Sequence, residues 1–390
     1  MSLGDDAAPR NRRSYQQPYG SELGSTAAGH LRHLARQPRP TCSAEAADAR
    51  SYCSHVLSAL GYRVTARPFE YSAAVGRYGT PVAGAASLML VVAAASLSLG
   101  GHPGAALAAL AIGFVGIALG GRWLASRGVL TLPTIRQRGV NIEAVSGDGD
   151  PELWLVAHAD SKSQPVPLLV RAAGIVLLAL ATLGAFALAI AGVIGSHSAH
   201  AWPLVIVAAV LGAIPVLGSV VGRASHGAVD NASGVATILC VAELFGPNTD
   251  LPMGVLITDA EELGLAGARA WCAETKYGAA PVLNCDGVDD VGQLTVMWTR
   301  PRARRLEDAF RRAAGRAGHT LRFTRLIPGV LVDAVAFSDA GWEAVTLSRG
   351  SLATLSRIHT RQDDLEHLTG RGIVDATLLL GSVVDQLMES

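Results

Sequence analysis

The sequence predicts an α/β protein in which a mixed central sheet, flanked by helices, is interrupted by four transmembrane helices. Two observations support this fold class. Short apolar runs bounded by turn residues alternate with amphipathic segments, a pattern typical of the strands and helices of one α/β domain. Two long intervals contain no Asp, Glu, Lys or Arg, and each is long enough to cross a bilayer twice.

The overall composition excludes some classes of protein. The 32 basic and 32 acidic residues balance, which argues against a nucleic-acid partner. The five cysteines lack the spacing of a metal site, so we interpret them as reduced and mostly buried thiols. A disulfide between Cys42 and Cys53 is the alternative interpretation.

The N-terminal part of the chain predicts a tail, a helix and a strand. Residues 1–29 are polar and rich in Gly, Ala and Pro, so we expect a disordered tail without a cleaved signal. Ser43 predicts the N-cap of a helix that ends near Gly61. Residues 62–71 alternate apolar and polar side chains as a strand does, and Pro68 favours an edge position.

The two charge-free intervals predict two transmembrane hairpins. Residues 79–121 are divided by a Gly/Pro turn at 100–104, and residues 172–222 by a polar turn at 196–200. A bilayer core needs about 20 apolar residues per helix, and each half supplies them. Each hairpin returns to its starting side, so the remaining sequence is expected to form one discontinuous domain. That domain comprises residues 30–78, 123–170 and 224–390.

The charges at the hairpin ends predict the side of the membrane. Five arginines flank the hairpins on the globular side, and the two turns carry no Lys or Arg. These arginines are Arg77, Arg122, Arg127, Arg171 and Arg223. By the positive-inside rule we expect a cytoplasmic domain in a multi-pass protein of the plasma membrane.

The globular sequence beyond the hairpins has the pattern of an α/β sheet. Further strands are expected at residues 141–145, 153–156, 254–258, 281–284 and 344–347. Amphipathic helices are expected at residues 303–317 and 373–388. In open α/β sheets the ligand crevice lies beyond the carboxyl ends of the strands, so side chains that follow these runs should converge.

Several of the apolar runs end in potential metal ligands. One run leads into His158, one into Asp286, and one into Asp259, Glu261 and Glu262. Asp230 lies in a short polar loop that opens into an apolar helix, where a carboxylate could be shared by two cations.

Two short motifs have both a chemical and a structural interpretation. In His158-Ala159-Asp160, the carboxylate could orient a metal-bound imidazole, although such a pair is often only a satisfied surface contact. In Glu261-Glu262, one acid could bind metal while its neighbour accepts a proton from water. An adjacent acid pair is more often a solvated helix start.

Five ordered motifs carry a resemblance to a known family. They are HADS at 158–161, GAVDNASG at 227–234, DAEELGLAGA at 259–268, NCDG at 284–287 and IHTRQDDLEHL at 358–368. With them the chain resembles the co-catalytic di-zinc aminopeptidases, metallopeptidase family 28. Relatives of these enzymes include glutamate carboxypeptidase, glutaminyl cyclase and the transferrin receptor ectodomain. The resemblance implies the zinc-exopeptidase fold outside the hairpins.

The resemblance also implies a set of site residues. Asp230 would bridge two zinc ions. The other implied ligands are His158 and Asp286 for one ion, and Glu262 and His359 for the second. Three carboxylates and two imidazoles suit Zn²⁺ and leave positions open for water and substrate.

Three acidic residues have implied roles beside the ligands. Glu261 matches the family's general base, Asp160 the carboxylate behind the ligand histidine, and Asp363 the acid that follows the last histidine. The chain also departs from the family pattern. Val229 stands where many relatives have an acid, and the family's Ser-Asp-His segment is replaced by Val332-Asp333-Ala334, which lacks the histidine.

We therefore expect a membrane-anchored aminopeptidase whose partners are the lipid bilayer and a peptide substrate with a free N-terminus. One alternative is acyl transfer of the glutaminyl cyclase type with a single zinc ion. Another is a catalytically dead peptidase fold that serves as a receptor or scaffold.

Overall fold

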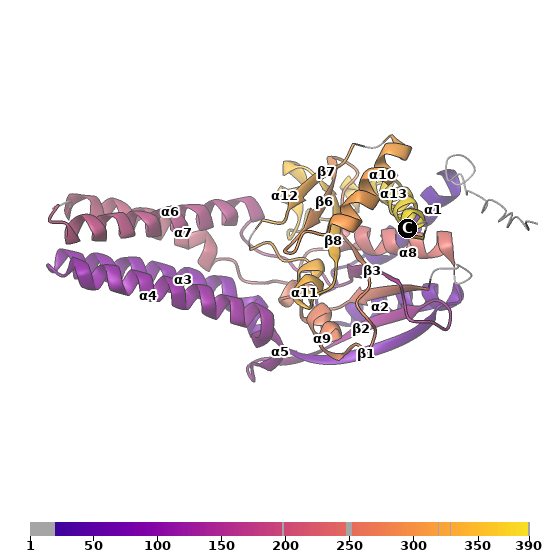
Figure 1. Ribbon diagram of the computed structural model, residues 1–390, viewed down its shortest axis with the longest axis horizontal. Coiled ribbons are helices and arrows are strands. Elements are labelled where there is room, and N and C mark those ends of the chain that lie inside the picture. Colours follow the sequence, from indigo (N-terminus) through magenta and orange to yellow (C-terminus); the bar gives the residue numbers. More distant parts are fainter. Residues whose placement is uncertain (1–19, 197–198, 247–251, 319, 328, 389–390) are drawn as a thin grey trace, which may run out of the picture.

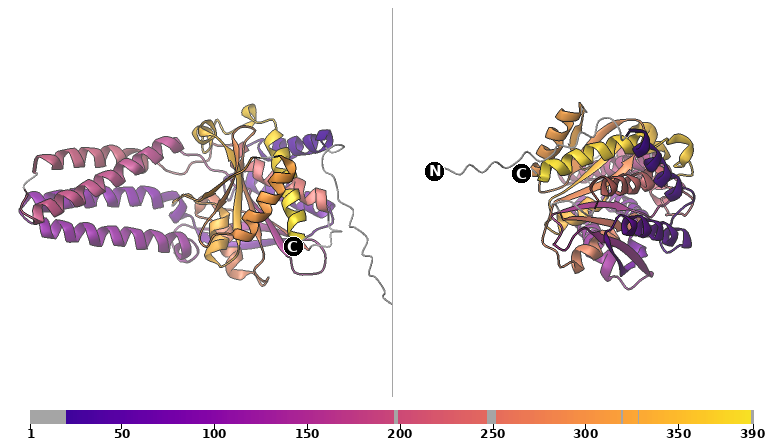
Figure 2. Two further views of the ribbon diagram at one scale, coloured as in Figure 1. Left: turned by 45° about the horizontal axis from the view of Figure 1, so that its top comes forward. Right: turned by 90° about the vertical axis from the view of Figure 1, so that its right-hand side faces the viewer.

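The computed structural model describes residues 20–196, 199–246, 252–318, 320–327 and 329–388. It has two parts, an α/β domain and a bundle of four long helices that projects from one side of it (Figure 1). The domain is built on one eight-stranded sheet with the order β1-β2-β4-β3-β5-β8-β6-β7. Helices cover both faces of this sheet (Figure 2).

The sheet is mixed. Its strands are β1 (Arg63–Ser72), β2 (Arg136–Val145), β3 (Leu153–His158), β4 (Met253–Thr258), β5 (Val282–Val288), β6 (Gln293–Trp298), β7 (Arg322–Arg325) and β8 (Ala344–Gly350). The central strands β4, β3, β5 and β8 are parallel, while β2 and β6 pair antiparallel on either side of them. The mixed sheet flanked by helices confirms the predicted fold class. Strands β6 and β7 were not predicted.

Two layers of helices enclose the sheet. One face packs against α1 (Gly20–Leu34), α2 (Ala44–Ala59), α8 (Gly234–Phe245), α10 (Arg304–Ala317) and α13 (Arg371–Met388). The other face packs against α9 (Ala266–Glu274) and α11 (Asp333–Asp339), around the buried rings of Trp154, Trp271 and Phe337. The large core on both faces fixes the strand ends that carry the polar residues.

Helix α1 corrects the prediction of a disordered tail. Residues 20–29 belong to this helix, and the rest of the predicted tail lies outside the described residues. Leu23, Ala27, Leu31 and Leu34 follow helical spacing and are buried against the domain. The small and polar residues between them concealed this apolar stripe.

The next two elements agree with their predictions. The Ser43 hydroxyl accepts a hydrogen bond from the N–H of Ala46 at 3.0 Å and caps α2, which ends just before Gly61. β1 is the first strand of the sheet, so Pro68 lies on an edge strand. All five cysteines are free thiols, and Cys53, Cys240 and Cys285 are buried.

The four long helices form an antiparallel bundle outside the domain. They are α3 (Ala73–Leu99), α4 (Pro103–Trp123), α6 (Leu168–Val193) and α7 (Trp202–Leu217). Small side chains such as Ala94, Ala106 and Ala185 fill the interior, while large apolar ones such as Leu183 and Leu204 are exposed. Each helix is long and apolar enough to cross a membrane, α7 together with the short helix η2 (Ala199–Ala201) that precedes it. A fifth such segment, Ala228–Phe245, is 83% buried and lies in the core of the α/β domain instead.

All four long helices join the domain at the same edge of the sheet. β1 runs in the same direction as β3 and β4, because β2 pairs antiparallel with both β1 and β4. α3 starts directly after β1, where Ser72 pairs with Arg136 at the start of β2. α6 follows β3, and a bridge between Ser163 and Gly222 ties its leading segment to the segment after α7. The bundle therefore extends from the carboxyl ends of the central strands, which we call the carboxyl edge.

Candidate metal centre

The predicted site residues come from separate elements that meet at the carboxyl edge. His158 is the last residue of β3, and Asp286 lies near the end of β5. Asp230 lies in the turn η3 (Ala228–Ser233) that precedes α8. Glu262 belongs with Glu261 to the short helix η4 (Glu261–Leu263), just after β4. The last of the set, His359, follows α12 (Leu352–Arg357).

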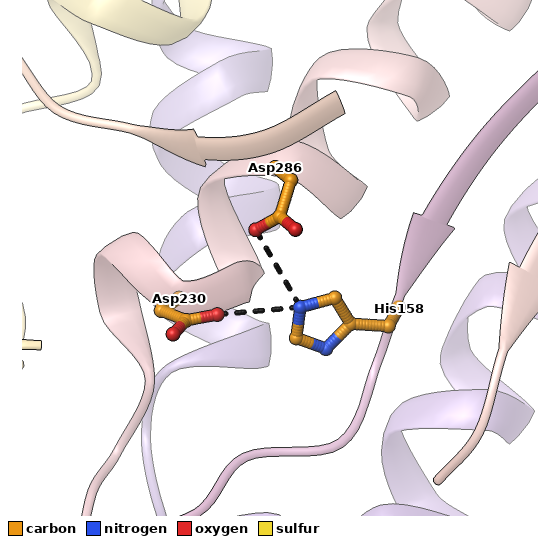
Figure 3. Close-up of side chains that lie close together, drawn as sticks. All are labelled: His158, Asp230 and Asp286. Atoms are coloured by element: carbon orange, nitrogen blue, oxygen red, sulfur yellow. Dashed lines mark ion pairs between the residues drawn. The ribbon is translucent and has the colours of Figure 1, made fainter. Parts of the chain in front are cut away.

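The first group of potential ligands surrounds the Nε2 atom of His158 (Figure 3). This nitrogen lies 3.2 Å from Asp230 Oδ1 and 3.6 Å from Asp286 Oδ1. His158 itself is almost fully buried. Its other ring nitrogen, Nδ1, lies 3.1 Å from the backbone oxygen of Asp160, so Nε2 is the atom left to bind a ligand.

The second group shares Asp230 with the first. His359 Nε2 lies 2.8 Å from Asp230 Oδ2 and 3.5 Å from Glu262 Oε1. The two carboxylate oxygens of Asp230 therefore face different groups, each of which contains one histidine and one further acid. One carboxylate between two such groups is the arrangement expected of a ligand shared by two cations.

Buried atoms without partners show that the two groups fit metal ions. His158 Nε2 and Glu262 Oε1 are buried and make no hydrogen bond. A buried polar atom without a partner is costly, and coordination would satisfy both atoms. Nitrogen and carboxylate donors in this proportion suit Zn²⁺. The described residues therefore contain two candidate groups whose donors suit Zn²⁺: His158 with Asp230 and Asp286, and Asp230 with Glu262 and His359.

The electrostatics of the cluster also favour cations. Burial raises the pKa of Glu261 well above its ordinary value, and the nearby carboxylates of Glu262 and Asp286 add to the effect. Burial likewise raises the pKa of Asp286. Burial opposes ionisation of Asp230, but the adjacent imidazoles of His158 and His359 outweigh it and hold the pKa of Asp230 well below its ordinary value. Positive charge among these acids would relieve their mutual repulsion.

Asp160 and Asp363 hold the backbone segments that carry the candidate ligands. Asp160 lies with Oδ1 3.6 Å from His158 Nδ1, and its carboxylate accepts hydrogen bonds from the backbone N–H groups of Glu261 and Glu262. Asp363 accepts hydrogen bonds from the N–H groups of Val229 and Asp230, at 2.7 and 3.1 Å. Burial raises the pKa of Asp363 to about 7. Each of these carboxylates thus fixes a turn that carries ligand side chains.

The two positions at which the sequence departs from the pattern of the resembled family, Val229 and Asp333, are both buried and hydrogen-bonded. Val229 is buried in the core, and its backbone N–H donates a hydrogen bond to Asp363. Asp333, in the segment without the histidine, accepts a hydrogen bond from the Thr258 hydroxyl at the end of β4. Burial raises the pKa of Asp333 to about 7.

Arg39 supports the site and was not predicted from the sequence. Its guanidinium is fully buried and donates hydrogen bonds to the backbone oxygens of Ala159, His226 and Gly227, and of Leu34 at the end of α1. Arg39 therefore ties the segment after His158 to the segment before Asp230. A lone arginine after a helix gives no signal of this role, because the role depends on contacts more than 100 residues away.

Lys162 is the second unpredicted residue. Its Nζ atom lies 2.5 Å from Glu262 Oε2, while Oε1 of the same carboxylate faces His359. Although burial opposes it, the charges of Glu262 and Glu261 raise the pKa of Lys162. A cation therefore already pairs with one oxygen of Glu262, which leaves the other oxygen to act as a single-atom ligand.

The base of α3 contacts the helix η4 directly. A Cβ atom at Gly76 would lie 2.3 Å from Leu263 Cα, so any side chain there must displace the backbone beside Glu262 by about 1 Å. We expect Gly76→Ala to lower kcat/KM by roughly 100-fold, because displacement of catalytic groups by 1 Å can have an effect of this size. The measurement is hydrolysis of peptide substrates, the activity that the sequence resemblance implies, by purified protein of checked helical content.

Gly79 provides the control for this substitution. It lies almost one turn further along α3 and has open space at its Cβ position, so Gly79→Ala should leave hydrolysis unchanged. Equal activity of the two variants would show that η4 tolerates the displacement.

Comparisons with known proteins agree with this geometry. The sequence model of Peptidase family M28 matches residues 141–384. No match was found among curated proteins. Solved structures with a similar fold include an aminopeptidase from Aneurinibacillus sp. strain AM-1, which is 15% identical with a TM-score of 0.56, covering 93% of each chain.

Two further structures have the same degree of similarity. A zinc aminopeptidase from Bacillus subtilis is 15% identical with a TM-score of 0.56, covering 93% of this chain and 95% of its own. A Bacteroides thetaiotaomicron glutaminyl cyclase bound to N-acetylhistamine is 12% identical with a TM-score of 0.56, covering 93% and 97%. At these identities the similarity establishes the fold.

Proposed function

The chain belongs to peptidase family M28, and from this premise we propose that it is a membrane-anchored zinc aminopeptidase. The observation that carries the proposal is the position of Asp230, whose two carboxylate oxygens each face a histidine from a different group. The substrate is a peptide with a free N-terminus. The products are its N-terminal amino acid and the shortened peptide.

The proposed chemistry divides between the metal and the side chains. Zinc, when bound, lowers the pKa of a water molecule and polarises the substrate carbonyl. Glu261 belongs to neither ligand group, and its Oε2 atom lies 3.9 Å from His158 Nε2. We assign its carboxylate the role of accepting a proton from the attacking water and transferring it to the leaving amine.

Other residues of the chain orient the proposed base and the proposed ligands. Asp160 holds the backbone of Glu261 and Glu262, so the proposed base and its neighbouring ligand keep a fixed relative position. Asp363 holds the backbone of Val229 and Asp230 in the same way, which fixes the turn that carries the proposed shared ligand.

Metal removal and replacement test the proposal. We expect dialysis against a zinc chelator to abolish release of N-terminal residues from aminoacyl fluorogenic substrates, and added Zn²⁺ to restore it. The untreated protein should contain two zinc ions, measured by atomic emission. Hydrolysis that persists after complete removal of metal would contradict the proposal, and the inert scaffold would be supported if the zinc-loaded protein hydrolysed nothing.

The membrane placement is part of the same proposal. The four helices of the bundle carry exposed apolar side chains over most of their length, which suits lipid and not water. The arginines at the base of the bundle favour a cytoplasmic α/β domain. Protease digestion of the domain in sealed vesicles of known orientation measures the side directly.

Lys162 favours a second candidate function. The contact between its Nζ atom and Glu262 Oε2 places a positive charge against a ligand of the second group, which favours occupancy by a single zinc ion. A single zinc suits acyl transfer of the glutaminyl cyclase type. A stoichiometry of one ion, together with conversion of glutaminyl peptides to pyroglutamyl peptides, would support this function over hydrolysis.

A further inference from the structure

The metal centre and the base of the helix bundle occupy the same edge of the domain. Of the candidate ligands, His158, Glu262 and Asp286 lie at the carboxyl ends of the central strands, and α3 and α6 follow the carboxyl ends of β1 and β3. The contacts are direct, since α3 touches η4 at Gly76 and the N–H of Gln164, shortly before α6, donates to the backbone oxygen of His359 at 2.8 Å. The metal centre therefore lies at the end of the domain from which the bundle extends.

The distance from this centre to the apolar part of the bundle is short. Arg77 is the last charged residue before the apolar length of α3, and it is adjacent to Gly76, which contacts Leu263 next to Glu262. An α-helix rises about 1.5 Å per residue, so the apolar turns of α3 begin within roughly 10 Å of η4, the short helix that carries Glu261 and Glu262. Because bilayer hydrocarbon would surround these turns, the site would lie close to the membrane surface.

Several exposed apolar side chains of the domain lie at or near the same edge. Leu352 and Leu355 belong to α12, which follows the end of β8 and contacts α6, and Leu352 is 73% exposed. Val330 and Leu331 are exposed in the segment that leads into Asp333, which binds Thr258 at the end of β4.

Two further exposed apolar residues lie at the carboxyl edge, whereas Ile327, which follows the end of β7, lies at the opposite edge. Ile135 is exposed just before β2, and Val291 in the turn after β5, both at the carboxyl edge. Exposed apolar groups gathered around a site mark contact with a membrane or a partner. Because α12 contacts α6 at the base of the bundle, we take the bilayer surface as the partner of this contact.

We propose that the natural substrates are polypeptides anchored in the same membrane, whose N-termini lie close to the bilayer surface, rather than peptides that diffuse freely in water. This inference rests on the proposed function and specifies its substrate class. A site held at the lipid surface meets the short N-terminal segment of an anchored chain at a high effective concentration. If a long spacer lets the N-terminus range far into the water, its effective concentration at the site is much lower.

Matched substrates in vesicles test this inference. The full chain is reconstituted with its zinc in phosphatidylcholine vesicles, with the α/β domain facing outwards. Two substrates carry the same N-terminal sequence and the same C-terminal transmembrane helix, separated by a flexible spacer of about 5 or about 30 residues. A third substrate is the short-spacer peptide without the helix, and release of the N-terminal amino acid is measured for all three.

We expect the anchored substrate with the short spacer to be hydrolysed at least tenfold faster than the one with the long spacer. Both are equally enriched in the vesicles, so the comparison excludes simple partitioning. Equal rates for the two spacers, or preference for the long one, would overturn the inference while the aminopeptidase proposal stands. Failure to hydrolyse any of the three, including the soluble peptide, would instead contradict the proposed function.

A variant of the exposed leucines of α12 gives a second test. Leu352→Ser combined with Leu355→Ser alters exposed side chains and should leave the fold intact. We expect it to slow hydrolysis of the short-spacer anchored substrate several-fold and to leave the soluble peptide unaffected. An equal decrease for both substrates would show that these residues serve the site itself and not its contact with the membrane.

Discussion

Glu261→Gln is expected to lower kcat by about 100- to 10,000-fold, the range that a general base contributes. The amide is isosteric with the carboxylate but cannot accept the proton from water. Glu261 belongs to neither ligand group, so the variant should retain its zinc. The measurements are turnover of an aminoacyl substrate and metal content of the same preparation.

The neighbouring residue supplies the control. Glu262 belongs to the second group of potential ligands, and its Oε1 atom lies 3.5 Å from His359 Nε2. Glu262→Gln should therefore lose zinc from that group. The two adjacent substitutions therefore separate the loss of a base from the loss of a ligand. Full activity of Glu261→Gln would exclude its role as the base, and loss of its zinc would assign it to the metal instead.

Arg39→Met is expected to lower the free energy of unfolding by about 3–5 kcal/mol, because it leaves several buried carbonyl oxygens without donors. For a domain of this size the corresponding fall in Tm is roughly 10 °C. Burial lowers the pKa of Arg39 to about 10, so the side chain is still charged at neutral pH. The measurement is thermal unfolding of purified protein followed by circular dichroism.

Arg36 provides the matched control for Arg39. It is exposed and pairs with the exposed Asp48 at 2.5 Å. Exposed ion pairs contribute about 0–1 kcal/mol, so Arg36→Met should change Tm very little. If the two variants unfold at the same temperature, the buried contacts of Arg39 with the site segments contribute no net stability.

The fold class could be predicted because its signals are local. Apolar runs and turn residues mark most of the strands, and charge-free length marks the four long helices. The signals failed where local sequence is weak. β7 spans only Arg322–Arg325 and contains two arginines, while α1 shows its buried stripe only once α8 and α13 pack against it.

The candidate site illustrates the same limit. His158 and Asp286 end apolar runs, so their convergence follows from the rule that parallel strands share a carboxyl edge. The structure brings them together with Asp230, Glu262 and His359. Arg39 and Lys162 could not be found this way, because their partners come from distant segments and a single basic residue has no pattern of its own.

The two pairings that close the hairpin bases, Ser72 with Arg136 and Ser163 with Gly222, offer a route for protein engineering. Neighbouring strands lie about 5 Å apart, a gap that a tight turn of two to four residues closes. Exchanging each hairpin for such a turn keeps all eight strands in register. We expect the product to be an α/β domain without the apolar bundle, which can be tested directly for crystallisation without detergent.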